Sequence, residues 1–300
     1  APVGAGAPDA GPIEALDAGS VSLVIRTSSL RLPTPTTRAV AFATASGLLV
    51  VGGLTPGGTT GRVIRVPFGG GAASVVGRLA HPVHDAGGAL LHGSMLVLGG
   101  GASTQDAWVQ RVAVDGPAAV QGRLPSPRAD LAAVGAGSRV VVVGGGAAGR
   151  ADARVLVTTD GSRFTVAARL PVPVRYAAVA VVGSRVLVIG GASAAGDTAV
   201  IQSVDLVRGI AAVVGRLPES ISHATALLVG GVVVVVGGRH AGRALDSVLE
   251  VDPTSLAVRV AGRLPRAESD AAGVVVDGVG YLVGGETDRP LATIVTIRAA

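Results

Sequence analysis

The sequence predicts an all-β fold, a six-bladed β-propeller whose blades are four-stranded antiparallel sheets. Three observations lead to this prediction. A pair of glycines preceded by apolar residues recurs six times, at intervals of 45 to 47 residues. An Arg-Leu dipeptide, usually followed by Pro, recurs at the same intervals. Each interval has room for four short strands separated by turns. Repeats that cannot bury their apolar faces alone are typical of stacked architectures such as propellers.

Both markers keep their step along nearly the whole chain. The glycine pairs are Gly52-Gly53, Gly99-Gly100, Gly144-Gly145, Gly190-Gly191, Gly237-Gly238 and Gly284-Gly285. The dipeptides are Arg31-Leu32, Arg78-Leu79, Arg123-Leu124, Arg169-Leu170, Arg216-Leu217 and Arg263-Leu264.

The third interval illustrates the strands of one blade, which we expect at residues 129–136, 139–143, 153–158 and 163–169. Asp160-Gly161 between the last two strands is a strong hairpin signal. The second strand contains the run Val140 to Val143 and has no polar face. Both of its sides must therefore be covered, and neighbouring blades can provide that cover.

The last interval is incomplete, because only residues 286–300 follow its glycine pair. They suffice for a third strand near residues 293–298 but not for a fourth. Residues 20–30 precede the first Arg-Leu dipeptide, where a fourth strand stands in every other interval. We therefore expect this N-terminal strand to complete the last blade, which removes a free sheet edge. Residues 20–300 then form one domain, and residues 1–19, rich in Ala, Gly, Pro and Asp, form a flexible leader.

Composition excludes several classes of protein and of site. There is no Cys, so disulfides, thiolate metal sites and cysteine nucleophiles are absent. No apolar stretch reaches the roughly 20 residues of a transmembrane helix. The chain has neither Lys nor Asn, a pattern typical of a bacterium with a GC-rich genome. The start and the spacer-like leader lead us to expect a protein exported to the cell surface or beyond, with a possible membrane or lipid anchor upstream.

The net charge of +5 does not indicate nucleic acid binding. Six of the 25 Arg residues belong to the Arg-Leu dipeptides, which leaves 19 against 20 acidic residues. We expect the repeated Arg to cap carbonyl groups or to form ion pairs between blades. Aromatic residues make up 2% of the chain and are not interleaved with Arg, as single-strand binding would favour.

The repeat resembles the kelch repeat. Residues 126–134, Ser-Pro-Arg-Ala-Asp-Leu-Ala-Ala-Val, lead to Val140–Val143 and then to Gly144-Gly145, which is similar to the entry segment, small-residue strand, four apolar residues and glycine pair of a kelch blade. Kelch blades usually carry a Tyr and a Trp after the glycines, and here only Trp108 corresponds to them. The resemblance implies a galactose oxidase-like propeller. It also implies ligand binding where the loops into the first strands and the loops after the glycine pairs meet the central channel.

Counting back from each glycine pair predicts the side chains at this channel mouth. Fourteen positions before the first glycine stand Arg38, Asp85, Asp130, Tyr176, His223 and Asp270. Counting back fifteen positions from the first glycine adds His84 and Arg175, and counting back sixteen positions adds Arg128 and Glu268. These positions vary between blades and are polar, whereas their neighbours stay small or apolar. Variation between blades at one fixed depth is what a shaped binding site requires, although a mouth that is merely solvated would also be polar.

We predict a non-catalytic binding or scaffolding module that engages a protein, peptide or glycan at the channel mouth, without cofactor. Arg38, Arg175 and Tyr176 would anchor the ligand, and Asp85, Asp130 and Asp270 would accept hydrogen bonds. A metal held among Asp85, Asp130, Asp270, His84 and His223 is an alternative that channel-opposed positions disfavour. The binding-module prediction therefore includes no metal site and no catalytic residue.

A channel-site enzyme is the other alternative. Among propellers of this resemblance, copper radical oxidases need a Tyr-Cys cross-link, which the absence of Cys rules out. Sialic acid mutarotases use polar groups in the channel. In a mutarotase-like enzyme, Glu268 or His223 would act as general base beside Arg38 or Arg175. Ser222 and His223 are neighbours in the sequence, and alternation along a strand predicts that they point to opposite faces and form no catalytic pair.

Overall fold

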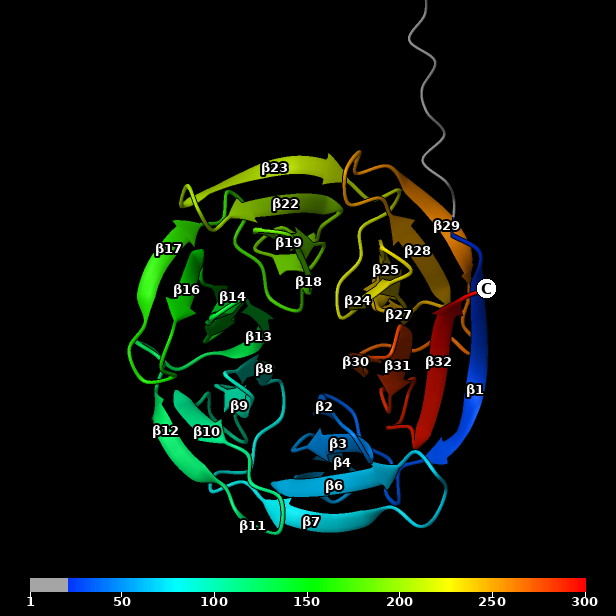
Figure 1. Ribbon diagram of the computed structural model, residues 1–300. Helices are drawn as coiled ribbons and strands as arrows, with labels where there is room; N and C mark the ends of the chain where they lie inside the picture. Colours follow the sequence, from blue (N-terminus) through cyan, green and yellow to red (C-terminus); the bar gives the residue numbers. More distant parts are fainter. Residues whose placement is uncertain (1–20) are drawn as a thin grey trace, which may run out of the picture.

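The computed structural model describes residues 21–300 and arranges them as six antiparallel blades around a central axis (Figure 1). This confirms the predicted all-β, six-bladed propeller. The predicted leader, residues 1–19, lies outside the described residues. Among residues 21–300 no helix is long and apolar enough to cross a membrane.

The blades are numbered in chain order, and the strands of each blade are given in order from the innermost, at the axis, to the outermost, at the rim. Blade 1 contains β2 (Val40–Thr44), β3 (Gly47–Val51), β6 (Arg62–Pro67) and β7 (Ser74–Arg78); blade 2 contains β8 (Gly87–Leu91), β9 (Ser94–Leu98), β10 (Trp108–Arg111) and β12 (Ala119–Arg123); blade 3 contains β13 (Ala129–Ala136), β14 (Arg139–Ala147), β16 (Arg154–Thr158) and β17 (Thr165–Arg169). Blade 4 contains β18 (Ala178–Val182), β19 (Arg185–Ile189), β22 (Val200–Asp205) and β23 (Ile210–Arg216); blade 5 contains β24 (Thr225–Val229), β25 (Val232–Val236), β28 (Ser247–Val251) and β29 (Val258–Arg263); blade 6 contains β30 (Ala272–Val276), β31 (Val279–Val283), β32 (Thr293–Ala299) and β1 (Leu23–Arg31).

The loops that follow four of the glycine pairs contain short two-residue strands. They are β4 (Leu54–Thr55) with β5 (Gly58–Thr59), β15 (Arg150–Ala151) with the end of β14, β20 (Ala192–Ser193) with β21 (Gly196–Asp197), and β26 (Arg239–His240) with β27 (Arg243–Ala244). One more, β11 (Gly116–Pro117), pairs in parallel with β7 of the neighbouring blade.

The apolar core lies between the blades. The second strands are the most buried elements, and every residue of β3 and β25 is buried. Each of six apolar clusters joins two neighbouring blades; in one of them, Leu98 and Val109 of blade 2 pack with Leu131 and Val140 of blade 3. Neighbouring blades therefore cover both faces of the second strands, as their unbroken apolar runs predict.

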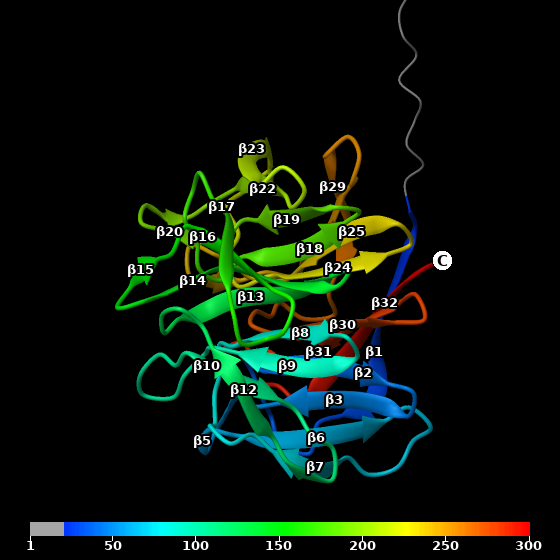
Figure 2. The same ribbon diagram turned by 60° about the vertical axis from the view of Figure 1, so that its left-hand side comes forward.

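The first described strand lies at the outer edge of the last blade. β1 pairs with β32 in antiparallel register, with Leu23 opposite Ala299 and Thr27 opposite Val295. Figures 1 and 2 both show the two strands side by side at the rim. Two chain segments separated by the whole sequence thus share one sheet, and the inner edge of β1 is paired rather than open.

The glycine pairs connect each blade to the next one. The N–H of every second glycine donates to a backbone carbonyl of the following blade at 2.8–3.1 Å, as in Gly191 to Ile221. A Cβ on any first glycine would lie 2.1–2.6 Å from that same carbonyl oxygen. Both glycines also have positive φ values. Close approach and left-handed backbone together therefore require glycine here.

The Arg-Leu dipeptides owe their regularity to the Leu. All six Leu are buried, and their backbone N–H groups donate to carbonyls at 2.7–3.0 Å. All six Arg are exposed. Arg263 pairs with Asp246 of its own blade, and Arg123 lies over the ring of Trp108. The other four form no side-chain hydrogen bond or ion pair within residues 21–300. The prediction that these Arg cap carbonyls or link blades is wrong, because their side chains extend into solvent.

Candidate functional site at the channel mouth

Six residues form a closed backbone ring around the axis, and we call them the mouth ring: Arg38, Asp85, Asp130, Tyr176, His223 and Asp270. Five of them stand two residues before the inner strand of their blade, and Asp130 is the second residue of β13. The N–H of each donates to the carbonyl of the equivalent residue in the preceding blade, over 2.9–3.1 Å, and Arg38 closes the circle by donating to Asp270. The mouth ring therefore holds one side chain per blade at the same depth.

The mouth ring has an unusual backbone conformation. All six residues have φ between 54° and 61°. Asp and His tolerate this left-handed region, whereas it is uncommon for Arg and Tyr. Such a conformation persists where the surrounding structure imposes it, and such residues cluster at functional sites. Here the circular hydrogen bonds impose it.

A small polar cavity of about 110 Å³ lies at the mouth ring and leads to a larger channel. Besides the ring residues it is lined by the residue that follows each of them, an Ala in five blades and Leu131 in blade 3. The six residues that follow the mouth-ring residues also line the larger cavity, so the two cavities are continuous.

Two arginines and three acidic residues form an ion-pair cluster on one side of the mouth. Arg38 lies 3.4 Å from Asp85, 3.2 Å from Glu286 and 3.9 Å from Asp270. Arg239 lies 2.7 Å from Glu286 and 3.5 Å from Asp270. The acidic side chains are 4–13% exposed, whereas the two guanidinium side chains are about a quarter exposed, at 26% and 24%. The carboxylates thus support the arginines from beneath while the arginines face solvent.

The other side of the mouth carries an aromatic pair and a third arginine. The rings of Tyr176 and His223 stack with their centroids 3.8 Å apart. Arg175 donates to Asp130 at 3.0 Å, and its guanidinium lies 5.3 Å from the Tyr176 ring. Arg175 is 28% exposed, so it too reaches solvent. This half of the mouth therefore presents a flat ring surface beside a charged donor.

Burial changes the titration of several mouth groups. Burial raises the pKa of Asp85 to about 7, and the nearby Asp130 and Asp270 add to this effect, although Arg38 opposes it. Burial lowers the pKa of His84, and Arg38 lowers it further. Burial also lowers the pKa of His223, assisted by Arg239 and Arg38 and opposed by Asp270. Both imidazoles are therefore neutral near pH 7.

Through Asp85, stability is expected to rise as the pH falls from 8 to 5. The pKa of Asp85, about 7 when folded, exceeds the roughly 3.9 of an unfolded Asp, so the folded protein gains stability as pH falls through 7. Asp85→Asn keeps the shape, tolerates positive φ and does not titrate. Urea unfolding at both pH values should give a smaller increase for Asp85→Asn than for the unmodified protein. Equal increases would show that Asp85 does not titrate in this range.

Eight of the ten sequence-predicted residues meet at the mouth. Beside the mouth ring itself, Arg175 contacts Asp130, and His84 lies with Nε2 3.6 Å from Asp85 while its Nδ1 shares a hydrogen bond with Thr59. The two residues counted back by sixteen positions do not lie there. Arg128 is fully buried and its guanidinium contacts Asp152 and the Gly144 carbonyl.

Glu268, the other residue counted back by sixteen positions, is 3% exposed. Burial raises the pKa of its carboxyl to about 7, with Arg266 opposing. This position is buried in every blade, because its carbonyl accepts the hydrogen bond from the second glycine of the preceding blade. Placing Arg128 and Glu268 at the mouth is therefore a prediction that the structure contradicts.

The expectation that Ser222 and His223 point to opposite faces is also wrong. Ser222 Oγ lies 2.7 Å from His223 Nδ1, within hydrogen-bond distance. Alternation along a strand assumes extended backbone, and His223 has φ of 57°. The left-handed turn brings the two side chains to the same side. Ser222 is 1% exposed, so its hydroxyl orients the imidazole from within the protein.

Sequence reasoning missed two residues of the site, Arg239 and Glu286. Both stand two positions after the first glycine of their pair, and they form β-bridges with Ser222 and Ser269 beside the mouth ring. The other blades have Leu, Gly or Ala at this position. Two charged residues in an otherwise small or apolar column were the signal that could have identified them. Within residues 21–300 no group of three His, Asp or Glu side chains is arranged to hold a metal ion.

Comparison with known proteins shows the fold alone. No protein-family model and no curated protein matches this sequence. Among solved structures, the chain is similar to that of YjhT, with a TM-score of 0.75 and 13% sequence identity. The similarity covers 89% of this chain and 99% of that one. It therefore extends over most of the propeller.

Proposed function

We propose that this protein is a non-catalytic binding module that holds a protein, peptide or glycan ligand at the mouth ring. The observation that carries the proposal is the mouth ring itself. A closed set of six backbone hydrogen bonds fixes six side chains, of four residue types, on one rim. A pre-organised rim loses little conformational entropy on binding, which favours affinity. A purely structural ring would work equally well with one residue type in every blade.

The exposed guanidinium groups indicate which ligand groups the mouth would hold. Arg38, Arg175 and Arg239 are each about a quarter exposed and are oriented by buried carboxylates. Guanidinium groups held in this way bind carboxylates and carbonyl oxygens with defined geometry. The stacked Tyr176 and His223 offer a flat surface to a sugar or proline ring. Asp130 would accept a hydrogen bond from a ligand hydroxyl or amide.

Arrays of glycans and peptides probed with the purified chain test the proposal. We expect a restricted set of binders that carry a carboxylate or clustered hydroxyl groups. Arg175→Ala should abolish their signals, because it removes an exposed guanidinium group from the mouth. The mouth ring should stay intact, since Arg175 contacts a single carboxylate and is not needed to hold the ring together. Arg169→Ala, which removes an exposed Arg at the end of β17, should keep them. Signals that survive Arg175→Ala, or an array without binders, would contradict binding at the mouth.

A channel-site enzyme acting on a sugar or a small acid is the second candidate. The neutral His223, oriented by Ser222, and Asp85 with a pKa of about 7 are suited to proton transfer near neutral pH. The relevant assay is anomer exchange of a sialic acid followed by nuclear magnetic resonance. In this alternative His223→Ala abolishes the exchange, and Glu268→Gln leaves it intact because Glu268 is buried between blades. Absence of exchange in the unmodified protein excludes this reaction.

A further inference from the structure

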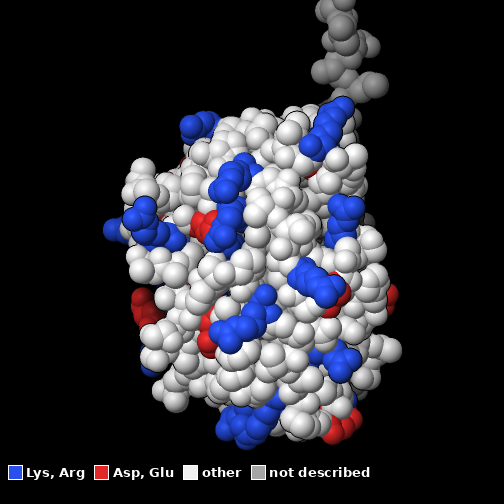
Figure 3. All heavy atoms as spheres, turned by 90° about the vertical axis from the view of Figure 1, so that its left-hand side faces the viewer, with Lys and Arg blue, Asp and Glu red and all other residues white. Residues whose placement is uncertain are grey.

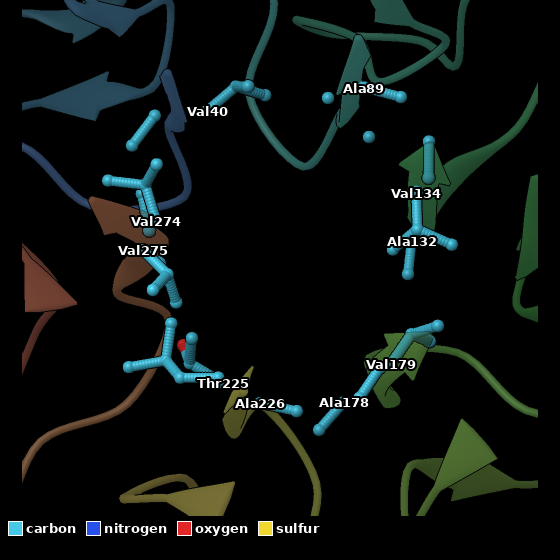
Figure 4. A pocket seen from close by; sticks show the side chains of 18 of the residues that line it. Val40, Ala89, Ala132, Val134, Ala178, Val179, Thr225, Ala226, Val274 and Val275 are labelled. Atoms are coloured by element: carbon cyan, nitrogen blue, oxygen red, sulfur yellow. The ribbon is translucent and has the colours of Figure 1, made fainter. Parts of the chain in front are cut away.

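The side chains that line the central channel below the mouth ring are almost all apolar. The channel has a volume of about 640 Å³ and is lined by five consecutive residues from each blade, namely 39–43, 86–90, 131–135, 177–181, 224–228 and 271–275. Thr225 is the sole residue in this lining with a polar side chain, and its hydroxyl donates to the Ala271 carbonyl at 2.7 Å. Figure 4 shows Val, Ala and Thr side chains around an open centre. The lining therefore offers no free polar side chain to a ligand or to water.

The two ends of the channel differ in chemistry. The lining segments begin next to the mouth ring and run away from it, so their last residues lie at the opposite end. There Leu90 and Leu228 are 49% and 45% exposed. They belong to blades 2 and 5, which face each other across the axis. One end of the channel is thus charged, and the other is an apolar opening.

Basic residues flank the apolar opening. Arg139 and Arg185 are the first residues of β14 and β19, at the hairpins next to the ends of β13 and β18 in neighbouring blades. Arg139 is exposed, and Arg185 donates to the Pro253 carbonyl at 3.2 Å. The corresponding hairpin of blade 2 contains His92. Among the hairpins that join the first and second strands of the blades, the hairpin of blade 6, opposite blade 3, contains the acidic residue Asp277. Asp205 stands opposite Arg185 in the pairing of β19 with β22, so the positive charge beside this opening rests on Arg139.

We infer that the channel is a second binding site, distinct from the mouth, that takes the alkyl chain of a long-chain carboxylic acid. The chain enters at the opening formed by Leu90 and Leu228, and the carboxylate stays outside beside Arg139. The volume lies within the usual range of ligand pockets, which are mostly apolar. Five residues of strand give the channel a length of roughly 17 Å. Removal of this apolar lining and the alkyl chain from water drives the association.

Charge complementarity favours a carboxylate over a cationic or neutral amphiphile. Arg139 forms no ion pair within residues 21–300 and is available to an anionic group. At the other end of the channel, an alkyl terminus that reached the mouth ring would remove water from its ion pairs, which is unfavourable. The tail therefore stops before the mouth ring. The inference does not depend on the ligand proposed for the mouth.

Isothermal titration of the intact chain with saturated carboxylates of eight to sixteen carbons provides the test. Because each buried CH₂ contributes about 0.8 kcal/mol, affinity should rise about fourfold per carbon until the channel is full. Leu228→Glu should weaken binding at least tenfold. Val213→Glu, at an equally exposed position on the outer strand β23, should not change it. Arg175→Ala at the mouth should also leave it unchanged, which separates this site from the proposed function.

A second variant covers the case in which Leu228→Glu fails to fold. Ala226→Phe fills the channel with an apolar side chain and should abolish binding of the longer acids. Arg139→Ala should weaken carboxylates but not the matching alcohols. Affinity that is independent of chain length, or equal binding by Leu228→Glu, Ala226→Phe and Val213→Glu, would overturn the inference.

Discussion

Replacing Gly190 by Ala is expected to destabilise the protein by about 4 kcal/mol, whereas Gly183→Ala should cost only about 1 kcal/mol. The two glycines flank the same strand, β19, and have nearly equal φ values of 62° and 59°. Both substitutions therefore pay the same cost for a left-handed backbone. They differ in what the new Cβ meets. At Gly190 it would lie 2.2 Å from the Ile221 carbonyl oxygen of blade 5, and at Gly183 nothing lies within 4 Å.

The excess cost at Gly190 measures the contact between blades 4 and 5. Relief of the clash requires the blades to separate, which weakens the 2.8 Å hydrogen bond from Gly191 to Ile221 and the apolar packing around it. Urea unfolding of the two variants gives the comparison directly. Equal losses at Gly190 and Gly183 would show that the glycine pairs serve only the turn and not the joining of blades.

Arg38→Met is expected to cost about 3 kcal/mol at pH 8, because it leaves the buried carboxylate of Asp85 without its guanidinium partner and removes one of the two arginines that contact Asp270. Asp85 and Asp270 are 9% and 4% exposed, and Arg38 is in contact with both. Met keeps much of the apolar stem, so the loss reports charge rather than packing. Arg169→Met, at an exposed and unpaired position, should change stability by less than about 0.5 kcal/mol.

The loss caused by Arg38→Met should shrink at pH 5. Asp85, with a pKa of about 7, is then protonated and no longer needs the guanidinium. Thermal or urea unfolding of Arg38→Met and Arg169→Met at both pH values measures this change. A loss at pH 8 no greater than that of Arg169→Met would mean that the ion-pair cluster does not support the mouth.

The sequence was sufficient for the fold because the repeat is marked by residues whose roles are strictly geometric. A glycine pair is required wherever a blade approaches the next at a Cβ clash distance, and a buried Leu follows each fourth strand. These requirements recur in every blade, so they produce a regular step. The valine runs of the second strands are regular for the same reason, since each is covered on both faces.

The site was predicted only in part, because side-chain direction depends on local backbone. Counting positions correctly located the mouth ring. It failed for Arg128, because that position anchors the blade interface and is buried there. It failed for the Ser222–His223 pair, since alternation does not hold across a residue with positive φ. Arg239 and Glu286 come from a different loop, which meets the mouth ring only when the blades close around the axis.

The mouth ring and the apolar channel divide the molecule into two regions of different chemistry. Charged and aromatic side chains gather at one end of the axis, and the inner strands contribute aliphatic side chains along the rest. On the outer surface, Arg side chains are scattered among uncharged residues rather than joined in one patch, as Figure 3 shows for one side. That side therefore lacks the concentrated charge of the mouth.

The most direct test of a binding function at the mouth is one titration. A ligand identified on the arrays is titrated into the unmodified chain, Arg175→Ala and Arg169→Ala at the same ionic strength. Loss of a charge-assisted hydrogen bond predicts at least about tenfold weaker binding for Arg175→Ala and unchanged binding for Arg169→Ala. Affinities of all three proteins that agree within about twofold would contradict a site at the mouth ring.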